Sequence, residues 1–206
     1  MIPVIALSAM GMKMSTTASL LSTKTAYVQM RDDALMASMK RMMQDMHNQP
    51  MKGNIDLDFA TMLKVHHQGA IAMSKIELQQ GKDAAMKMMA QQIVDKQTRE
   101  VEELDQLIAS QQNAPKNYDS ANKTSGPGKA MSDNMMRMMK IGKMSMSSVD
   151  HEFADLMVKH HQDGIVMSKS IIAYSKTAKL KSMAQKAIPE QANDIQKMER
   201  WMKSHR

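Results

Sequence analysis

The stretch "DFATMLKVHHQGAIAMSK", residues 58–75, places two adjacent histidines, His66 and His67, inside an amphipathic pattern. Met62 stands four residues before the first histidine and Met73 seven residues after it. At about 100° per residue, His66, Met62 and Met73 share one face of a helix, and His67 lies at its shoulder. The stretch therefore predicts a helix that carries imidazole and thioether groups on one stripe.

The same pattern occurs a second time in the chain. "EFADLMVKHHQDGIVMSK", residues 152–169, follows at a constant offset of 94 residues and contains His160, His161 and Met167. The offset also pairs residues outside the motif: Phe59 with Phe153, Ala90 with Ala184, and Gln97 with Gln191. A constant offset over this length predicts two duplicated helical units.

The composition favours an all-α protein. Only 3% of the 206 residues are aromatic, glycine and proline are scarce, and the 28 methionines outnumber the leucines. There is no cysteine, which rules out disulfides, thiolate metal sites and thiol nucleophiles. We expect antiparallel helical packing in one bundle or two.

The spacing of apolar residues predicts six helices, separated by clusters of turn-forming residues. Their expected ranges are 26–47, 56–80, 83–111, 130–142, 149–175 and 177–204. Pro189 stands inside the last range and predicts a kink or a break there, because proline removes a backbone hydrogen bond.

The chain divides into four segments by composition. They are a flexible Met/Ser-rich tail or signal remnant (1–24), a first helical repeat (25–112), a polar linker (113–129) and a second helical repeat (130–206). The opening "MIPVIALSAMGM" is short and apolar, with Ala6 and Ser8 placed as in a signal-peptidase site, but no basic region precedes it. A signal remnant predicts a periplasmic or secreted protein, and a disordered tail is the other interpretation. No run approaches the roughly 18 apolar residues of a membrane span.

The formal net charge of +7 comes from 28 basic and 21 acidic side chains. A nucleic-acid-binding protein concentrates basic charge in a stripe and adds aromatic side chains for stacking. Here the lysines are dispersed, so we expect a solvated basic surface and no nucleic-acid partner.

Thioether and imidazole groups together are typical of a site for a soft, monovalent metal ion. Thioethers suit Cu(I) and are poor ligands for Mg²⁺ or Ca²⁺. The sequence therefore predicts a copper-binding protein that prefers Cu(I), with Ag(I) and Cu(II) as further candidates. The candidate metal ligands are His66, His67, Met73, Met62, His160, His161, Met167, Met43, Met46, His47, Met135 and Met139.

The first motif resembles the signature of a family of small bacterial helical proteins that is catalogued only as a domain of unknown function. The hallmark of that family is the run His-His-Gln-Gly-Ala-Ile followed by Met, and this chain resembles a tandem, two-copy member. The resemblance implies a ferritin-like helical fold, export from the cytoplasm and copper binding linked to metal resistance. By position, the copper-binding role that the resemblance implies falls on His66, His67 and Met73, and on their counterparts His160, His161 and Met167. The second copy departs from the hallmark at Asp163 and Gly164.

Two other interpretations stay open. Methionine at helical spacing is often a core residue, and a Met-rich helical module can bind partner helices through a pliable surface. A ferritin-like metal oxidase needs Glu-x-x-His motifs, and the sequence contains none. We therefore expect no catalytic residue, and a role in Cu(I) sequestration or delivery with a copper donor or acceptor protein as partner.

Overall fold

The computed structural model describes residues 34–142 and 147–205, and every regular element in those ranges is a helix. The chain is helical over 34–47 and then forms α2 (Ile55–Gln80), α3 (Ala84–Gln111), α4 (Gly126–Met138), α5 (Val149–Tyr174) and α6 (Ala178–Ser204). The predicted all-α class is confirmed. The predicted tail at 1–24 lies outside the described residues.

Two predicted features differ from the structure. The helix expected over 130–142 is α4, which begins earlier, because Pro127 occupies its first turn, where a missing N–H costs nothing. The break expected at Pro189 does not occur, and α6 continues through it from Ala178 to Ser204. Residues on both sides of the proline, Ala187 and Gln191, stay buried, so packing holds the helix in place where one backbone bond is lost.

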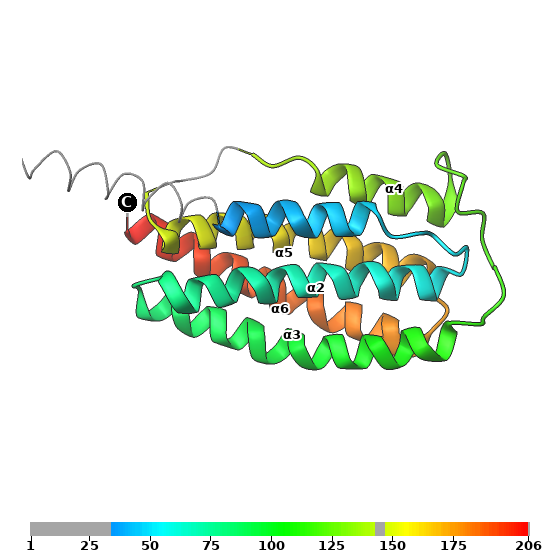
Figure 1. Ribbon diagram of the computed structural model, residues 1–206, viewed down its shortest axis with the longest axis horizontal. Helices are drawn as coiled ribbons and strands as arrows, with labels where there is room; N and C mark the ends of the chain where they lie inside the picture. The colour runs from blue at the N-terminus through cyan, green and yellow to red at the C-terminus, as the bar shows by residue number, and fades with distance from the viewer. Residues whose placement is uncertain (1–33, 143–146, 206) are drawn as a thin grey trace, which may run out of the picture.

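Two helical hairpins form the centre of the molecule. α2 packs along α3, α5 packs along α6, and the hairpins meet where α2 contacts α5. The helix over 34–47 and α4 lie on the side of the α2–α5 pair that is opposite to α3 and α6 (Figure 1). No helix in the part of the chain that the structure describes is long and apolar enough to cross a bilayer.

Equivalent carboxylates lock the two hairpins together in a pseudo-two-fold arrangement. Asp56, at the start of α2, accepts hydrogen bonds from the backbone N–H groups of Lys176 and Thr177 in the α5–α6 turn, at 2.9 and 3.2 Å. Asp150, its counterpart 94 residues later, accepts from the N–H groups of Lys82 and Asp83 in the α2–α3 turn, at 2.8 and 2.7 Å. Each helix start therefore holds the turn of the other hairpin, which fixes α2 and α5 antiparallel.

The segment predicted as a linker is attached to the start of α2. Asn117 Oδ1 accepts from the N–H of Ile55 at 2.9 Å, and Asn54 Nδ2 donates to the carbonyl of Pro115 at 2.9 Å. The hydroxyl of Tyr118 donates to Asp58 Oδ2 at 2.7 Å. These bonds place α4 beside α5.

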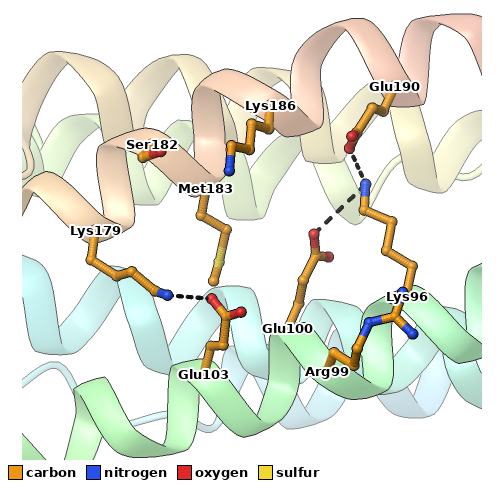
Figure 2. Close-up of a pocket in the computed structure, with 9 residues that line it drawn as sticks. All are labelled: Lys96, Arg99, Glu100, Glu103, Lys179, Ser182, Met183, Lys186 and Glu190. Atoms are coloured by element: carbon orange, nitrogen blue, oxygen red, sulfur yellow. Dashed lines mark hydrogen bonds and ion pairs between the residues drawn. The ribbon is translucent and has the colours of Figure 1, made fainter.

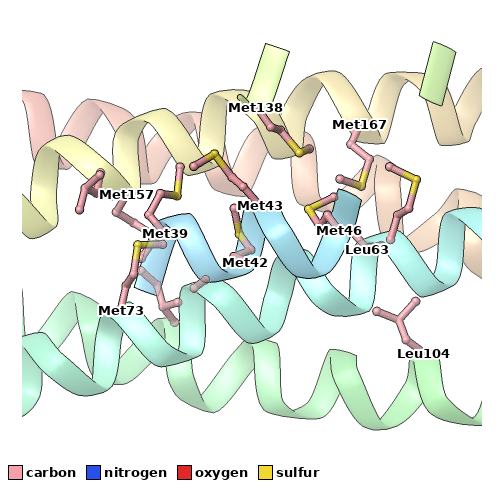
Figure 3. Close-up of a cluster of buried hydrophobic side chains, with 14 of the residues drawn as sticks. Met39, Met42, Met43, Met46, Leu63, Met73, Leu104, Met138, Met157 and Met167 are labelled. Atoms are coloured by element: carbon pink, nitrogen blue, oxygen red, sulfur yellow. The ribbon is translucent and has the colours of Figure 1, made fainter. Parts of the chain in front are cut away.

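Methionine is the commonest residue of the interior, and Figure 3 shows several of the buried thioethers. Buried thioethers from every described helix form one core with two phenylalanines, Phe59 and Phe153, which stand at equivalent positions of the two repeats. Methionine has three rotatable side-chain bonds and a polarisable sulfur, so it fills irregular gaps that branched side chains leave. The interpretation of methionine as core therefore holds for many of these residues, and position decides which sulfur atoms remain available to a ligand.

Replacing Asp56 with Ala tests the locking of the hairpins. The variant leaves the backbone N–H groups of Lys176 and Thr177 without their acceptor, so we expect the free energy of unfolding to fall by about 1–3 kcal/mol. The measurement is urea denaturation followed by circular dichroism. Asp133→Ala, which removes an exposed carboxylate paired with Lys129 on α4, is the control and should change stability by less than about 0.5 kcal/mol. Equal effects of the two substitutions would contradict the arrangement.

Candidate metal centre

The two histidine pairs meet inside the bundle, where α2 contacts α5. The imidazoles of His66 and His160 are fully buried and stacked, with ring centroids 3.7 Å apart and an angle of 28° between the planes. His160 Nε2 lies 2.9 Å from the carbonyl oxygen of His66. Since a carbonyl only accepts, Nε2 carries the proton and Nδ1 of His160 keeps a free lone pair.

The second histidine of each pair is oriented by a carboxylate. His67 Nε2 lies 3.1 Å from Glu100 on α3, and His161 Nε2 lies 3.7 Å from Asp194 on α6. The two carboxylates are themselves 94 residues apart. Our sequence analysis missed them, although the offset that pairs the histidines would have found them. A carboxylate on Nε2 favours the tautomer in which Nδ1 is unprotonated.

The Glu100 carboxylate belongs to a charged cluster between α3 and α6. Lys96 bridges Glu100 and Glu190, at 3.6 Å from the Glu100 oxygen (Figure 2). Burial alone would raise the pKa of the Glu100 carboxyl, but the hydrogen bond from His67 and the charge of Lys96 hold that pKa below its usual value. The pKa of Asp194 is lowered in the same way by His161, against the effect of burial. Both carboxylates are therefore ionised at neutral pH.

Several buried nitrogen atoms in this cluster have no hydrogen-bond partner. They are both ring nitrogens of His66 and the Nδ1 atoms of His67, His160 and His161, and each of these four residues is at most 1% exposed. Most buried polar atoms in proteins are paired, so five exceptions at one place need an explanation. A cavity of about 240 Å³ between α3 and α6 reaches His161 and is lined by the equivalent glutamines Gln97 and Gln191. His161 therefore lies beside an opening in the bundle.

Burial keeps the stacked pair uncharged. Loss of hydration lowers the pKa of His66 and of His160 well below the usual value, and repulsion among the neighbouring imidazoles lowers both further. Neutral imidazole is the form that binds metal. The stacked pair is therefore in a metal-binding protonation state at pH 7.

The predicted methionine ligands fall into three groups. Met43, Met73 and Met167 lie in the core, and Met73 and Met167 follow the histidines by seven residues, about 10 Å along the helix axis. Met73 is therefore almost two helical turns from His66 along α2. Met62 is closer, one turn before His66 on the same face, and on α5 Met157 stands one turn before His161; both methionines are fully buried.

The remaining predicted ligands gather at a different place. Met46, His47, Met62, Met135 and Met139 all line a pocket of about 350 Å³ between the helix over 34–47, α2 and α4. Residues 90 positions apart in the sequence are therefore brought together by the packing of α4. Met62 lines this pocket, and it lies on the same face of α2 as His66.

Among residues 34–142 and 147–205, no three His, Cys, Asp or Glu side chains are arranged to hold one metal ion. Any ion bound in this part of the chain would rely on two imidazoles, on thioethers or on both. That donor set favours a soft ion of low coordination number.

The model of the family described as "Domain of unknown function (DUF305)" matches residues 6–108 and 56–202. The chain belongs to the DUF305 family. Its fold is similar to CopM in the Ag-bound form (23% identity, TM-score 0.54) and to CopM in the Cu(I)-bound form (22% identity, TM-score 0.55), over 72% of this chain and 95% and 96% of those chains. It is also similar to a DUF305 fragment from Deinococcus radiodurans, at 16% identity and a TM-score of 0.52, over 73% of this chain and 96% of that one. No sequence among the curated proteins matches it.

The second DUF305 motif departs from the first for a reason of packing. Where the first copy has Gly69, a Cβ atom would lie 2.4 Å from the sulfur of Met42, so glycine lets the helix over 34–47 approach α2. The second copy has Asp163 there, buried and paired with Lys159 and with Arg137 of α4, at 3.2 Å from the latter. The two copies thus hold different outer helices, while both histidine pairs keep their positions.

The lowered pKa values of His66 and His160 predict how stability depends on pH. Below pH about 6.5 the unfolded chain binds protons at these histidines and the folded chain does not, so the free energy of unfolding should fall as the pH falls. His66→Gln removes one of these groups and should make that decrease shallower between pH 7.5 and 5. Denaturation of the metal-free protein at several pH values measures it. The exposed His47→Gln should leave the slope unchanged, and the same slope in all three proteins would contradict the prediction.

Proposed function

We propose that this protein binds monovalent copper at the buried histidine cluster and sequesters or delivers it. The observation that carries the proposal is the set of buried ring nitrogens, both of His66 and the Nδ1 atoms of His67, His160 and His161, that have no hydrogen-bond partner. A lone pair of this kind, taken out of water and left unpaired, costs stability. A bound metal ion would satisfy it.

The arrangement around these nitrogens supports a metal ligand role. In many metal sites the histidine that binds the ion donates its other ring N–H to a carboxylate, which fixes the tautomer and raises the basicity of the ligand. Glu100 stands in that relation to His67, and Asp194 faces His161 in the second repeat. An ordinary interior histidine needs no such partner in both copies.

The distances within each pair also support binding. The ring centroids of His66 and His67 are 6.4 Å apart, and those of His160 and His161 are 5.8 Å apart. An ion between two rings at this separation can reach one nitrogen of each at about 2 Å, a usual metal–imidazole distance. Cu(I) accepts such low coordination numbers, and the nearby thioethers of Met62 and Met157 are soft ligands that it prefers.

The comparisons support the same ion. CopM, whose fold this chain shares, exists in Ag-bound, Cu(I)-bound and Cu(II)-bound forms. We propose that this DUF305 protein likewise binds Cu(I), that Ag(I) competes for the same site, and that Cu(II) binds more weakly. We propose a non-catalytic role outside the cytoplasm, in which a copper donor or acceptor protein exchanges the ion.

Replacing Glu100 with Gln tests the ligand role of His67 without touching the imidazole. The variant loses the negative charge that fixes the tautomer, so we expect Cu(I) affinity to fall by about 10- to 100-fold. Titration against a competing Cu(I) chelator under anaerobic conditions measures it. Glu103→Gln is the matched control, because Glu103 lies one turn further on α3 and pairs with Lys179 at the surface, at 2.7 Å.

The metal preference gives a second test. We expect Ag(I) to displace Cu(I) from the cluster and Zn(II) to compete weakly, because thioethers add little to the binding of Zn(II). Competition titrations with each ion measure the preference. Zn(II) competing as well as Ag(I) would show a site of imidazoles alone, and a chain that takes up no Cu(I) at chelator-buffered micromolar levels would end the proposal.

A further inference from the structure

The methionine-lined pocket between the helix over 34–47, α2 and α4 is separate from the histidine cluster. Seven of its eleven lining residues are methionines, and His47 is an eighth soft ligand. We propose that this pocket is a second site for a monovalent soft ion, Cu(I) or Ag(I), and that it is the position where the protein exchanges ions with its surroundings.

The walls of the pocket come from three separate helices. Met46 and His47 come from the end of the helix over 34–47, Met62 from α2, and Met135 and Met139 from α4. Thioethers on opposite walls can approach one ion from several directions, which a single helix face does not allow. The pocket volume of about 350 Å³ leaves room for an ion with long, flexible side chains closing around it.

The exposure of two pocket residues argues for a ligand role over a packing role. Met136 is 56% exposed and Met139 is 55% exposed, so neither fills the core. Their apolar surface faces water next to buried Met46 and Met62, and an apolar patch kept at the surface commonly marks a binding site. An ion held by these sulfur atoms is reachable from solvent.

The charge of the pocket selects the kind of ion. Lys123 is its only charged lining residue, and no carboxylate is among the eleven. Hard cations such as Mg²⁺ or Ca²⁺ need oxygen ligands, and a positive side chain opposes a divalent ion more strongly than a monovalent one. Thioethers and one imidazole therefore leave Cu(I) and Ag(I) as the ions that fit.

Met62 connects the pocket to the interior. It lines the pocket, is fully buried, and stands one turn before His66 on the same face of α2. Met62 shares the pocket with the exposed Met136 and Met139, so the pocket reaches from the surface to a buried sulfur atom. The binding of an ion at the pocket does not depend on the histidine cluster.

Silver titration followed by NMR of ¹³C-methyl-labelled methionine tests the site directly. We expect the methyl signals of Met135, Met136 and Met139 to shift with added Ag(I), and that of Met88 to stay fixed. Met88 is the control because it is 59% exposed on α3 and lies outside the pocket. Signals assigned to the pocket that do not move would overturn the proposal.

Leucine substitutions distinguish ion binding at the pocket from ion binding at the buried cluster. They also distinguish an ion site from an apolar docking surface for another protein. Met136→Leu with Met139→Leu keeps the apolar surface and removes two thioethers, so the variant should bind one Ag(I) fewer, while Met88→Leu should bind as many as the unchanged protein. The double variant His67→Gln with His161→Gln should lose the buried site and keep the shifts at the pocket. An unchanged stoichiometry in the Met136/Met139 variant would show that these side chains only form an apolar surface.

Discussion

The contact between His66 and His160 is the constraint on which the rest of the structure depends. Two imidazoles stack at 3.7 Å in the centre of the bundle, and the N–H of one bonds to the main chain of the other helix. This contact requires α2 and α5 to approach closely at one register. A buried imidazole without a partner would be costly, so a shift by one residue along either helix is strongly opposed.

The duplication explains how so polar a centre can be stable. Each repeat contributes one stacked histidine, one histidine that faces a carboxylate of its own hairpin, and one buried glutamine. The carboxylates at the helix starts, Asp56 and Asp150, accept hydrogen bonds from the backbone of the turns at both ends of the α2–α5 contact. Five ring nitrogens of the four central histidines have no hydrogen-bond partner in this arrangement.

Methionine has two distinct uses in this protein. In the core it is a flexible apolar residue that packs around two phenylalanines. At the surface pocket the same side chain presents sulfur to solvent. The difference lies in exposure and in the helices that surround each residue, because the side chain itself is identical in both places.

The sequence by itself determined the helical class, the duplication, the boundaries of the four long helices and the four histidines at their centre. The period of the apolar residues and the constant offset between the two repeats carry this information. Burial on one helix face imposes a 3.6-residue repeat, and duplication imposes a constant spacing. Only the tertiary structure decided which side chains meet. It joined Glu100 to His67 across two helices and gathered Met46, Met62 and Met139 from three helices into one pocket. It also kept α6 continuous at Pro189, because packing against the rest of the bundle outweighs one lost backbone bond.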